Sequence, residues 1–587
     1  MPTINQMAAE LTHAFASGDA VHGNALLARI MAMQDRRSPQ TAGNRGNFAF
    51  YPEHSEPTDL NALSFCGPSL GYVAMEHDRH LTDDNRRALW DQVLPECLVG
   101  YDNHYRHKSG GGPGAPKPRW WQCNIWFLNM AGRLMIARAL EHAEHLATAR
   151  EHLALARQYV QLYGVAEYNS PTYLVPQLEA LHWAWHYAPD ADARQDATLL
   201  LDELYLDMAE HYHPTSGTLA GTWSRHYEWD VAGRGQVAPF LDAAFERRQP
   251  SFLEALGLED YQCPPAVREV AMTEQAYSVW RRNLAEVERT TYQTPEYSLA
   301  TQSGSFIWKQ QDTPVRLTYV APDGGRQTAL VRTPYWTSDV HAASDYAAGF
   351  ERWAHQHEHR AILSYGQTAG GNDLLFNLAT LDELTPDLAD GEGQPLAAPA
   401  CPMMPAPPST NPDRPASPHF NNKAANLTYA DPATRPPPGL AVSGPVLVGF
   451  PSCYLAIVPE AGLNLHIAAM QGDLVVAIPV RPTAMLALIM VGRSGCKTMI
   501  QFAEQVSQIN LDQITLPNVA NAARLQGLGP TLTAGRDADG RLFDRRVGDV
   551  WPEHQAYWCY SPFYTRRSGE TLSRAAQGTP KSTSTPE

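Results

Sequence analysis

Residues 120–140 have the sequence WWQCNIWFLNMAGRLMIARAL, which would be apolar on nearly every side of a helix. A helix without a polar face is usually buried on most sides, so Trp120 to His142 is predicted to be one long interior helix. The following segments carry apolar residues every three or four positions with charges opposite, which is typical of amphipathic helices. These apolar positions are Leu146, Ala149, Leu153, Ala156 and Val160, then Leu174, Leu178, Leu181 and Trp185.

Short connections such as Ala188-Pro189-Asp190 favour antiparallel helix pairs. Repeated pairs of one buried and one amphipathic helix, about ten helices in all, predict an incomplete α/α toroid of helical hairpins over residues 1–295. Local signals mark individual helix ends: Thr82 precedes two aspartates, and Ser170 can cap a helix beginning at Pro171. Pro95 is expected to kink or split its helix because it lacks a backbone N–H.

After about residue 297 the sequence changes to short β-type runs separated by turn signals. Many such runs indicate antiparallel sheets, and an antiparallel β-sandwich is predicted over residues 296–568, which makes the chain α+β and multidomain. The predicted strands are SFIWK (305–309), VRLTYV (315–320), TALVRT (328–333), RAILSY (360–365), VLVGF (446–450), CYLAIVP (453–459), LNLHIAAM (463–470), LVVAIPV (474–480) and AMLALIMV near Met485. Prolines interrupt residues 386–438, predicted to be an excursion or linker, and the polar tail 569–587 is predicted to be disordered.

The composition narrows the classes of partner. A formal net charge of −17 argues against nucleic acid, which requires a basic face. No run approaches the roughly 18 apolar residues of a membrane helix, and the first 30 residues lack the apolar stretch of a secretory signal. The eight cysteines have no zinc-type spacing. We therefore expect a cytoplasmic protein without a cofactor, or a secreted one if a leader has been removed.

Two segments of the predicted toroid combine amides with aromatic rings. One is Trp120 to Trp126, which follows a glycine-rich loop. If the Asn124 amide is buried, it must find a hydrogen-bond partner in the core or in a ligand. The other is Glu167 to Tyr173, which surrounds the predicted helix start at Pro171. Backbone N–H groups at a helix start favour an anion or a carboxylate. Together they supply Trp120, Trp121, Asn124, Tyr168, Asn169 and Tyr173.

A third segment, residues 222–230, follows His211-Tyr212-His213 and is denser in titratable and aromatic residues than a solvated turn requires. Such loops are disproportionately binding or catalytic sites. It supplies Trp223, Arg225, His226, Tyr227, Glu228 and Asp230.

Three histidines stand at alternate positions in the β-rich half: His355, His357 and His359. On a strand they would share one face. Imidazole nitrogens at that spacing could bind a metal ion, although three exposed histidines on a strand are the simpler interpretation. One of them could also reach across to the mouth of the toroid.

A helical toroid followed by antiparallel sheets resembles the polysaccharide lyases of the chondroitin AC lyase and heparinase II/III type. Those enzymes carry an Asn near an inner-helix Trp, then a His/Tyr pair and an Arg, in separate loops. Asn124, Asn169 with Tyr173, and Arg225-His226-Tyr227 follow a similar order. The resemblance implies a lyase that cleaves a polysaccharide or oligosaccharide containing uronic acid.

Such a lyase removes the C5 proton of the uronic acid and expels the oxygen on C4. The resemblance implies that Asn124 and Asn169 bond the carboxylate, with Arg225 in support, while His226 is the base and Tyr227 the acid. The reserve candidates are Tyr173 for the acid and His357 or His359 for the base. The implied substrate-binding residues are Trp120, Trp121, Tyr168, Trp223, Glu228, Asp230, His357 and His359.

Two other functions fit the same segments. A glycoside hydrolase would need two carboxyl groups, about 5 Å or about 6.5–9.5 Å apart, and Glu167, Glu228 and Asp230 lie in suitable loops. A sugar-binding protein without chemistry would lose binding, but no turnover, when Arg225 or Tyr227 is replaced.

Overall fold

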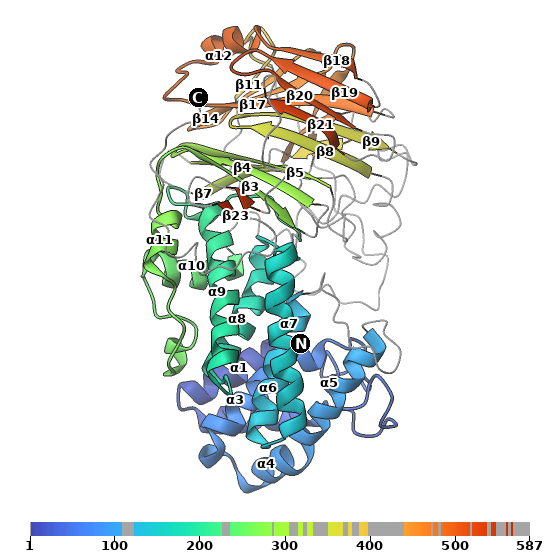
Figure 1. Cartoon of the computed structure of the whole chain (residues 1–587), viewed down its shortest axis with the longest axis vertical. Helices are drawn as coiled ribbons and strands as arrows, with labels where there is room; N and C mark the ends of the chain where they lie inside the picture. Colours follow the sequence, from blue (N-terminus) through green and yellow to red (C-terminus); the bar gives the residue numbers. More distant parts are fainter. Residues whose placement is uncertain are drawn as a thin grey trace.

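The computed structural model describes residues 2–108, 123–225, 235–283, 287–304, 315–320, 326–332, 350–367, 374–377, 387–396, 440–470, 473–478, 483–516, 519–536, 542–547, 559–560 and 565–566. Within these residues a helical part comes first and a part rich in antiparallel strands follows, so the chain is α+β (Figure 1).

The described helices are α1 (Ile4–Ala16), α2 (Ala20–Ala32), α3 (Ala62–Glu76), α4 (Asp83–Ala88), α5 (Leu94–Lys108), α6 (Cys123–Ala139), α7 (Ala143–Tyr163), α8 (Pro171–His186), α9 (Ala191–His211), α10 (Ala238–Leu241), α11 (Pro265–Ala271) and α12 (Met499–Val506). Two predicted caps are confirmed: the Thr82 hydroxyl accepts the N–H of Asn85 in α4, and that of Ser170 accepts the N–H of Tyr173 in α8. Pro95 lies in the first turn of α5, directly after the π-helical segment Leu89–Val93, and the helix continues through it.

The interior helix predicted from residues 120–142 is α6, which packs between α3 and α8. Every residue from Cys123 to Ala137 is buried, as its apolar circumference requires. Glycines of α3 and α6 make room for the Tyr101 side chain of α5, because a Cβ on Gly67 or Gly132 would lie 1.9 Å from the Tyr101 hydroxyl oxygen. Among the described helices, none combines the length and apolar character needed to cross a membrane.

The described strands are β1 (Tyr212–His213), β2 (Thr218–Leu219), β3 (Tyr277–Asn283), β4 (Val287–Gln293), β5 (Tyr297–Ser303), β6 (Val315–Val320), β7 (Arg326–Arg332), β8 (Phe350–His357), β9 (Arg360–Gln367), β10 (Leu374–Asn377), β11 (Asp387–Ala389), β12 (Leu440–Ser443), β13 (Val446–Gly449), β14 (Cys453–Pro459), β15 (Asn464–Met470), β16 (Asp473–Ile478), β17 (Thr483–Gly492), β18 (Asn510–Leu516), β19 (Val519–Gln526), β20 (Leu532–Arg536), β21 (Leu542–Val547), β22 (Cys559–Tyr560) and β23 (Thr565–Arg566). The predicted strands are confirmed except SFIWK (305–309), which lies outside the described residues.

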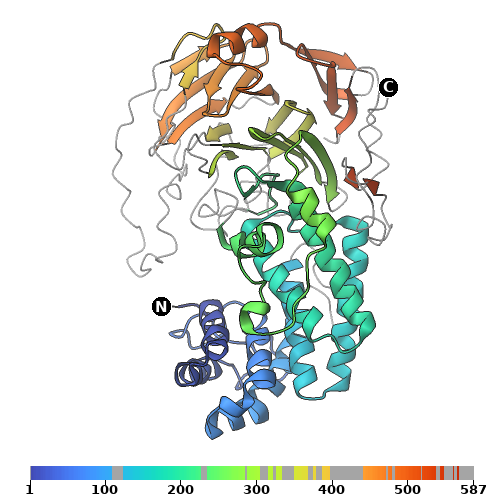
Figure 2. The ribbon, with the colours of Figure 1, turned by 90° about the vertical axis from the view of Figure 1, so that its left-hand side faces the viewer.

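Besides the β1–β2 ribbon, the strands form three sheets. An 11-stranded sheet has the order β12-β15-β16-β10-β7-β6-β5-β4-β3-β22-β23, a 6-stranded sheet β11-β13-β14-β17-β9-β8, and a 4-stranded sheet β18-β19-β20-β21. In Figures 1 and 2 the 11-stranded sheet lies next to the helical part and the other two lie beyond it.

The 6-stranded sheet contributes to two hydrophobic clusters, one on each face. Along β14, Leu455 and Ile457 belong to the cluster shared with the 11-stranded sheet. Tyr454 and Ala456 belong to the cluster shared with the 4-stranded sheet. A strand buried on both faces needs apolar residues at successive positions, which explains the unbroken runs in β14 and β17.

The strands begin earlier than the sequence indicates. The sequence indicates a change from helices to strands near residue 297, but β3 starts at Tyr277. The predicted domain boundary at 295/296 therefore falls in the turn between β4 and β5. Arg281 and Arg289 occupy buried positions in β3 and β4, where apolar residues would normally reveal a strand. Because these buried arginines interrupt the alternation of apolar and polar residues, the sequence of β3 and β4 does not indicate a strand.

The prediction that His355, His357 and His359 share one strand face is wrong. β8 ends at His357, and His359 lies in the β8–β9 turn, where Glu358 has a left-handed φ of 50°. Side chains alternate regularly only along a strand, so the period-two pattern ends at His357.

Candidate functional site

The connection between α7 and α8 is a buried loop, residues 165–170. Loops normally lie at the surface, yet each residue of this one is buried. Asn169 has a left-handed backbone with φ of 48°. Backbone of this kind costs free energy in an L-residue and is concentrated at functional sites. Asn adopts this conformation more readily than most residues that carry a Cβ, so the residue type at 169 suits the backbone there.

Glu167, which is fully buried, joins this loop to the starts of two helices. Its Oε2 accepts the backbone N–H of Asn124 at 2.9 Å, near the start of α6, and its Oε1 accepts Arg225 Nη1 at 2.8 Å. The Arg225 guanidinium lies 3.7 Å from the centre of the Tyr173 ring on α8. Burial raises the pKa of the Glu167 carboxyl, although Arg225 and the Asn124 N–H act in the opposite direction. Three predicted site residues are thus brought together around one carboxyl group.

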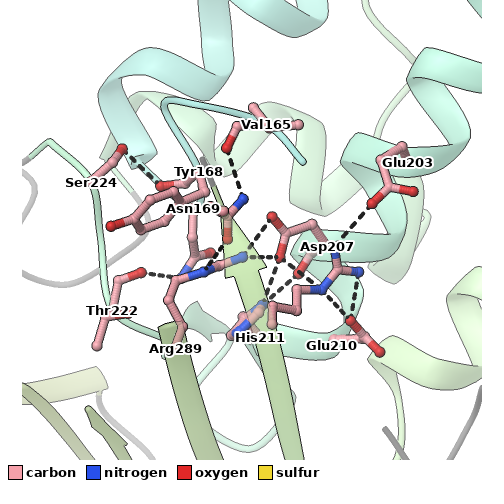
Figure 3. Close-up of polar contacts among 12 residues, drawn as sticks. Val165, Tyr168, Asn169, Glu203, Asp207, Glu210, His211, Thr222, Ser224 and Arg289 are labelled. Carbon is pink, nitrogen blue, oxygen red and sulfur yellow. Dashed lines mark hydrogen bonds and ion pairs between the residues drawn. The ribbon is translucent and has the colours of Figure 1, made fainter. Parts of the chain in front are cut away.

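The chain after β2 is fastened to the same loop. Ser170 Oγ donates to the Arg225 carbonyl at 2.6 Å, and Ser224 Oγ donates to the Tyr168 carbonyl at 3.0 Å. Asn169 Nδ2 donates to the Thr222 carbonyl at 3.3 Å. The second and third predicted segments therefore lie side by side (Figure 3).

His211, the last residue of α9, lies near Asn169 and is absent from the site residues predicted from the sequence. A Cβ on Gly221 would lie 2.2 Å from His211 Cδ2 and 2.7 Å from Asn169 Nδ2, so Gly221 fits between the two side chains. His211 Nδ1 lies 2.7 Å from the Asp207 carbonyl oxygen. A carbonyl only accepts, so Nδ1 carries a proton and a neutral ring keeps its lone pair on Nε2. The sequence feature that points to His211 is its place in His211-Tyr212-His213, shortly before residues 222–230.

Two aromatic residues predicted to bind sugar are covered by arginines. The Arg316 guanidinium of β6 lies 3.6 Å from the ring centre of Trp223, and that of Arg289 of β4 lies 4.3 Å from the ring centre of Tyr168. Tyr168 also donates its hydroxyl to Gln302 of β5 at 2.7 Å. A cation over a ring occupies the face that a sugar would cover. In this arrangement both rings join the helical part to the 11-stranded sheet.

The other predicted residues fall into two groups. Those outside the described residues are Trp120, Trp121, His226, Tyr227, Glu228 and Asp230. His357 and His359 lie at the β8–β9 turn, where burial lowers the pKa of both imidazoles. His359 packs near the ring of Tyr292, with 6.4 Å between the ring centres. Within the described ranges, no group of three or more His, Cys, Asp or Glu is arranged to hold a metal ion.

Comparisons with known proteins give a family of undetermined role and weak structural likenesses. Residues 36–246 match a family model described as a domain of unknown function, DUF8769. The chain is similar to heparinase III at 8% identity and a TM-score of 0.40, covering 82% of this chain and 75% of that chain. It is similar to a chondroitinase AC lyase at 8% identity and a TM-score of 0.32, covering 91% and 99%.

A chondroitin AC lyase from Streptomyces coelicolor A3 gives 10% identity and a TM-score of 0.34, covering 81% of this chain and 76% of that chain. A comparison with curated proteins gives no match. TM-scores and identities this low carry no information about activity, so the function has to be argued from the site itself.

Proposed function

We propose that the chain is a carbohydrate-active lyase that cleaves a glycan containing uronic acid by β-elimination. The helical part would form an incomplete α/α toroid, and the sheets beyond it an antiparallel β-sandwich that supports one mouth. The observation that carries the proposal is the placement of His211 and Asn169 beside the same glycine, Gly221, with the lone pair of the neutral imidazole on Nε2.

In this proposal His211 Nε2 takes the C5 proton of the uronic acid. The electron pair of the broken C–H bond forms the C4–C5 double bond as the C4–O bond breaks. Amide N–H groups of Asn169 and Asn124 bond the substrate carboxylate, which stabilises the negative charge that develops next to C5. Tyr227, close in sequence to Arg225, donates a proton to the leaving oxygen.

The roles of two predicted residues change. Arg225 is bonded to buried Glu167 and stacked on Tyr173, so we assign it to holding the site together and not to the substrate carboxylate. His226, predicted to be the base, becomes a second candidate for the proton donor, because His211 has the geometry of a base.

The hydrolase alternative loses one of its three carboxyl groups. Glu167 is fully buried, and both of its oxygens accept hydrogen bonds from the protein. A general acid or nucleophile needs an oxygen directed at the glycosidic bond. A carboxylate pair would therefore have to come from Glu228 and Asp230.

The test is a panel of uronic-acid glycans, followed by ultraviolet absorbance and by a reducing-end assay. A lyase raises both signals together, because each cleavage forms a C4–C5 double bond. Reducing ends without absorbance would identify a hydrolase, and binding without either product a sugar-binding protein.

His211→Gln is expected to abolish the absorbance signal. The matched control is His182→Gln, which removes a buried histidine bonded to Asp260 and Tyr205 elsewhere in the helical part. That variant should lose stability but keep its activity below its unfolding temperature. Full activity in Tyr227→Phe would reject Tyr227 as the acid.

A further inference from the structure

The C-terminal end of α9 carries three buried carboxylates at successive turns, Glu203, Asp207 and Glu210. Residues three or four apart share one face of a helix, and this face meets β3 and β4. Those strands supply the buried guanidiniums of Arg281 and Arg289. Figure 3 shows Arg289 directed at Asp207. Charges removed from water persist only when they are paired, so the sheet is required to neutralise this end of the helix.

The two arginines pair with all three carboxylates, and Arg281 Nε also lies 3.4 Å from Asp207 Oδ1. Arg281 Nε donates to Glu210 Oε2 at 2.7 Å, and its Nη1 donates to Glu203 Oε1 at 3.0 Å. Arg289 Nη2 lies 3.1 and 3.2 Å from the two carboxylate oxygens of Asp207, and its Nε donates to Asn283 at 2.8 Å. These additional hydrogen bonds fix the orientation of both guanidiniums next to Asp207.

Asp207 also contacts His211 one turn later on the same helix. His211 Nδ1 lies 3.1 Å from Asp207 Oδ1 and 2.7 Å from the Asp207 carbonyl oxygen. Burial would raise the pKa of Asp207, but Arg281, Arg289 and the hydrogen bond from His211 hold it well below its ordinary value. Asp207 is therefore a carboxylate, which accepts and cannot donate.

Arg289 connects this helix end to the loop that carries Asn169. Its guanidinium lies over the ring of Tyr168, the residue preceding Asn169. Asn283, which accepts from Arg289, donates its own Nδ2 to the Val165 carbonyl at 2.8 Å. One side chain of β4 thus sets the position of both the helix and the loop.

We propose that Asp207 is a positioning residue for His211 and is itself held by Arg281 and Arg289. The 11-stranded sheet, which carries both arginines, thus completes a site whose reacting groups lie on the helical part. The Asp207 carbonyl keeps the proton on Nδ1, and the Asp207 carboxylate, 3.1 Å from the same nitrogen, stabilises the positive charge that the ring gains when Nε2 takes a proton. This inference rests on the proposed function, in which His211 is the base.

The test compares Asp207→Asn with Glu203→Gln in the full chain. Each variant removes one buried carboxylate from the same face of α9, but only Asp207 contacts His211. Spectra of ¹⁵N-histidine-labelled protein, with the His211 signals assigned by their absence from His211→Gln, report its tautomer. We expect a proton on Nδ1 in the native chain, with a resonance that moves upfield in Asp207→Asn, as a charge-assisted hydrogen bond is lost, and stays in place in Glu203→Gln.

Kinetics then separate positioning from stability. We expect Asp207→Asn to lower kcat by about 10- to 100-fold at little change in KM, because the lost hydrogen bond strengthens only as the ring becomes charged. Glu203→Gln should stay within about threefold of native kcat, a difference too small for a lost charge-assisted bond. Equal losses in both variants, or a native ring without a proton on Nδ1, would overturn the inference. If no glycan is cleaved while the two spectral differences are found, the proposed function fails and the positioning of His211 by Asp207 stands.

Discussion

Gly221→Ala tests whether the placement of His211 and Asn169 beside Gly221 is used in the reaction. The added Cβ would lie 2.2 Å from His211 Cδ2. Carbon atoms that are not bonded rest about 3.5–4.0 Å apart, so the imidazole, the Gly221 backbone or both must move by about 1.3–1.8 Å. The backbone of Gly221 is not among those with positive φ, so alanine adds crowding without backbone strain.

A catalytic group misplaced by about 1 Å can cost about 10²-fold in rate. Crowding of a packed interior typically costs about 1–3 kcal/mol of stability. We therefore expect kcat/KM in the absorbance assay to fall by about 10²-fold or more, in a chain that still unfolds cooperatively.

The matched control is Gly495→Ala. A Cβ there would meet its nearest atom, Val491 Cγ1, at 3.5 Å, which is an ordinary contact. This variant should match the native chain in activity. Native kcat/KM in Gly221→Ala, together with a lowered unfolding temperature, would refute the reasoning, because the crowding would then be present without a consequence for the chemistry.

Asn169→Gly keeps the left-handed backbone without steric cost but removes the amide and its hydrogen bond to the Thr222 carbonyl, so activity should be lost in a chain that still unfolds cooperatively, whereas Asn169→Ala should lose about 1–2 kcal/mol more stability. Native activity in the glycine variant would contradict the role of the amide. Arg225→Met leaves the buried Glu167 carboxyl without its cation, and urea unfolding should show a loss of about 3–5 kcal/mol, partly recovered when Glu167→Gln is added. No recovery in the double variant would argue against the pairing. The pKa of Asp207 is held well below its ordinary value because neighbouring arginines outweigh its burial. Its stabilising contribution is therefore present above the unfolded value of about 3.9 and is lost as the pH falls through the lower native value, so Asp207→Asn should flatten the acid decline of the unfolding temperature.

Features that depend on neighbouring residues could be predicted from the sequence. The helix start at Ser170-Pro171 follows from a hydroxyl that accepts a backbone N–H and a ring that needs none. The strands Val315–Val320 and Cys453–Pro459 have the predicted bounds, because their apolar runs are short and closed by turn signals. Where buried arginines replaced apolar residues, in β3 and β4, the same signal failed.

The sequence by itself determined the order of a helical part and a β-rich part, the interior character of α6, and the enrichment of residues 167–173 and 222–230 in polar and aromatic groups. These properties are written in spacing and composition along the chain. The tertiary structure decided which of those groups meet. Only the folded chain places His211 and Asn169 beside Gly221 and pairs Arg289 of a distant strand with Asp207. Such contacts join residues far apart in sequence, and their energies come from burial and from paired charges, which no local pattern records.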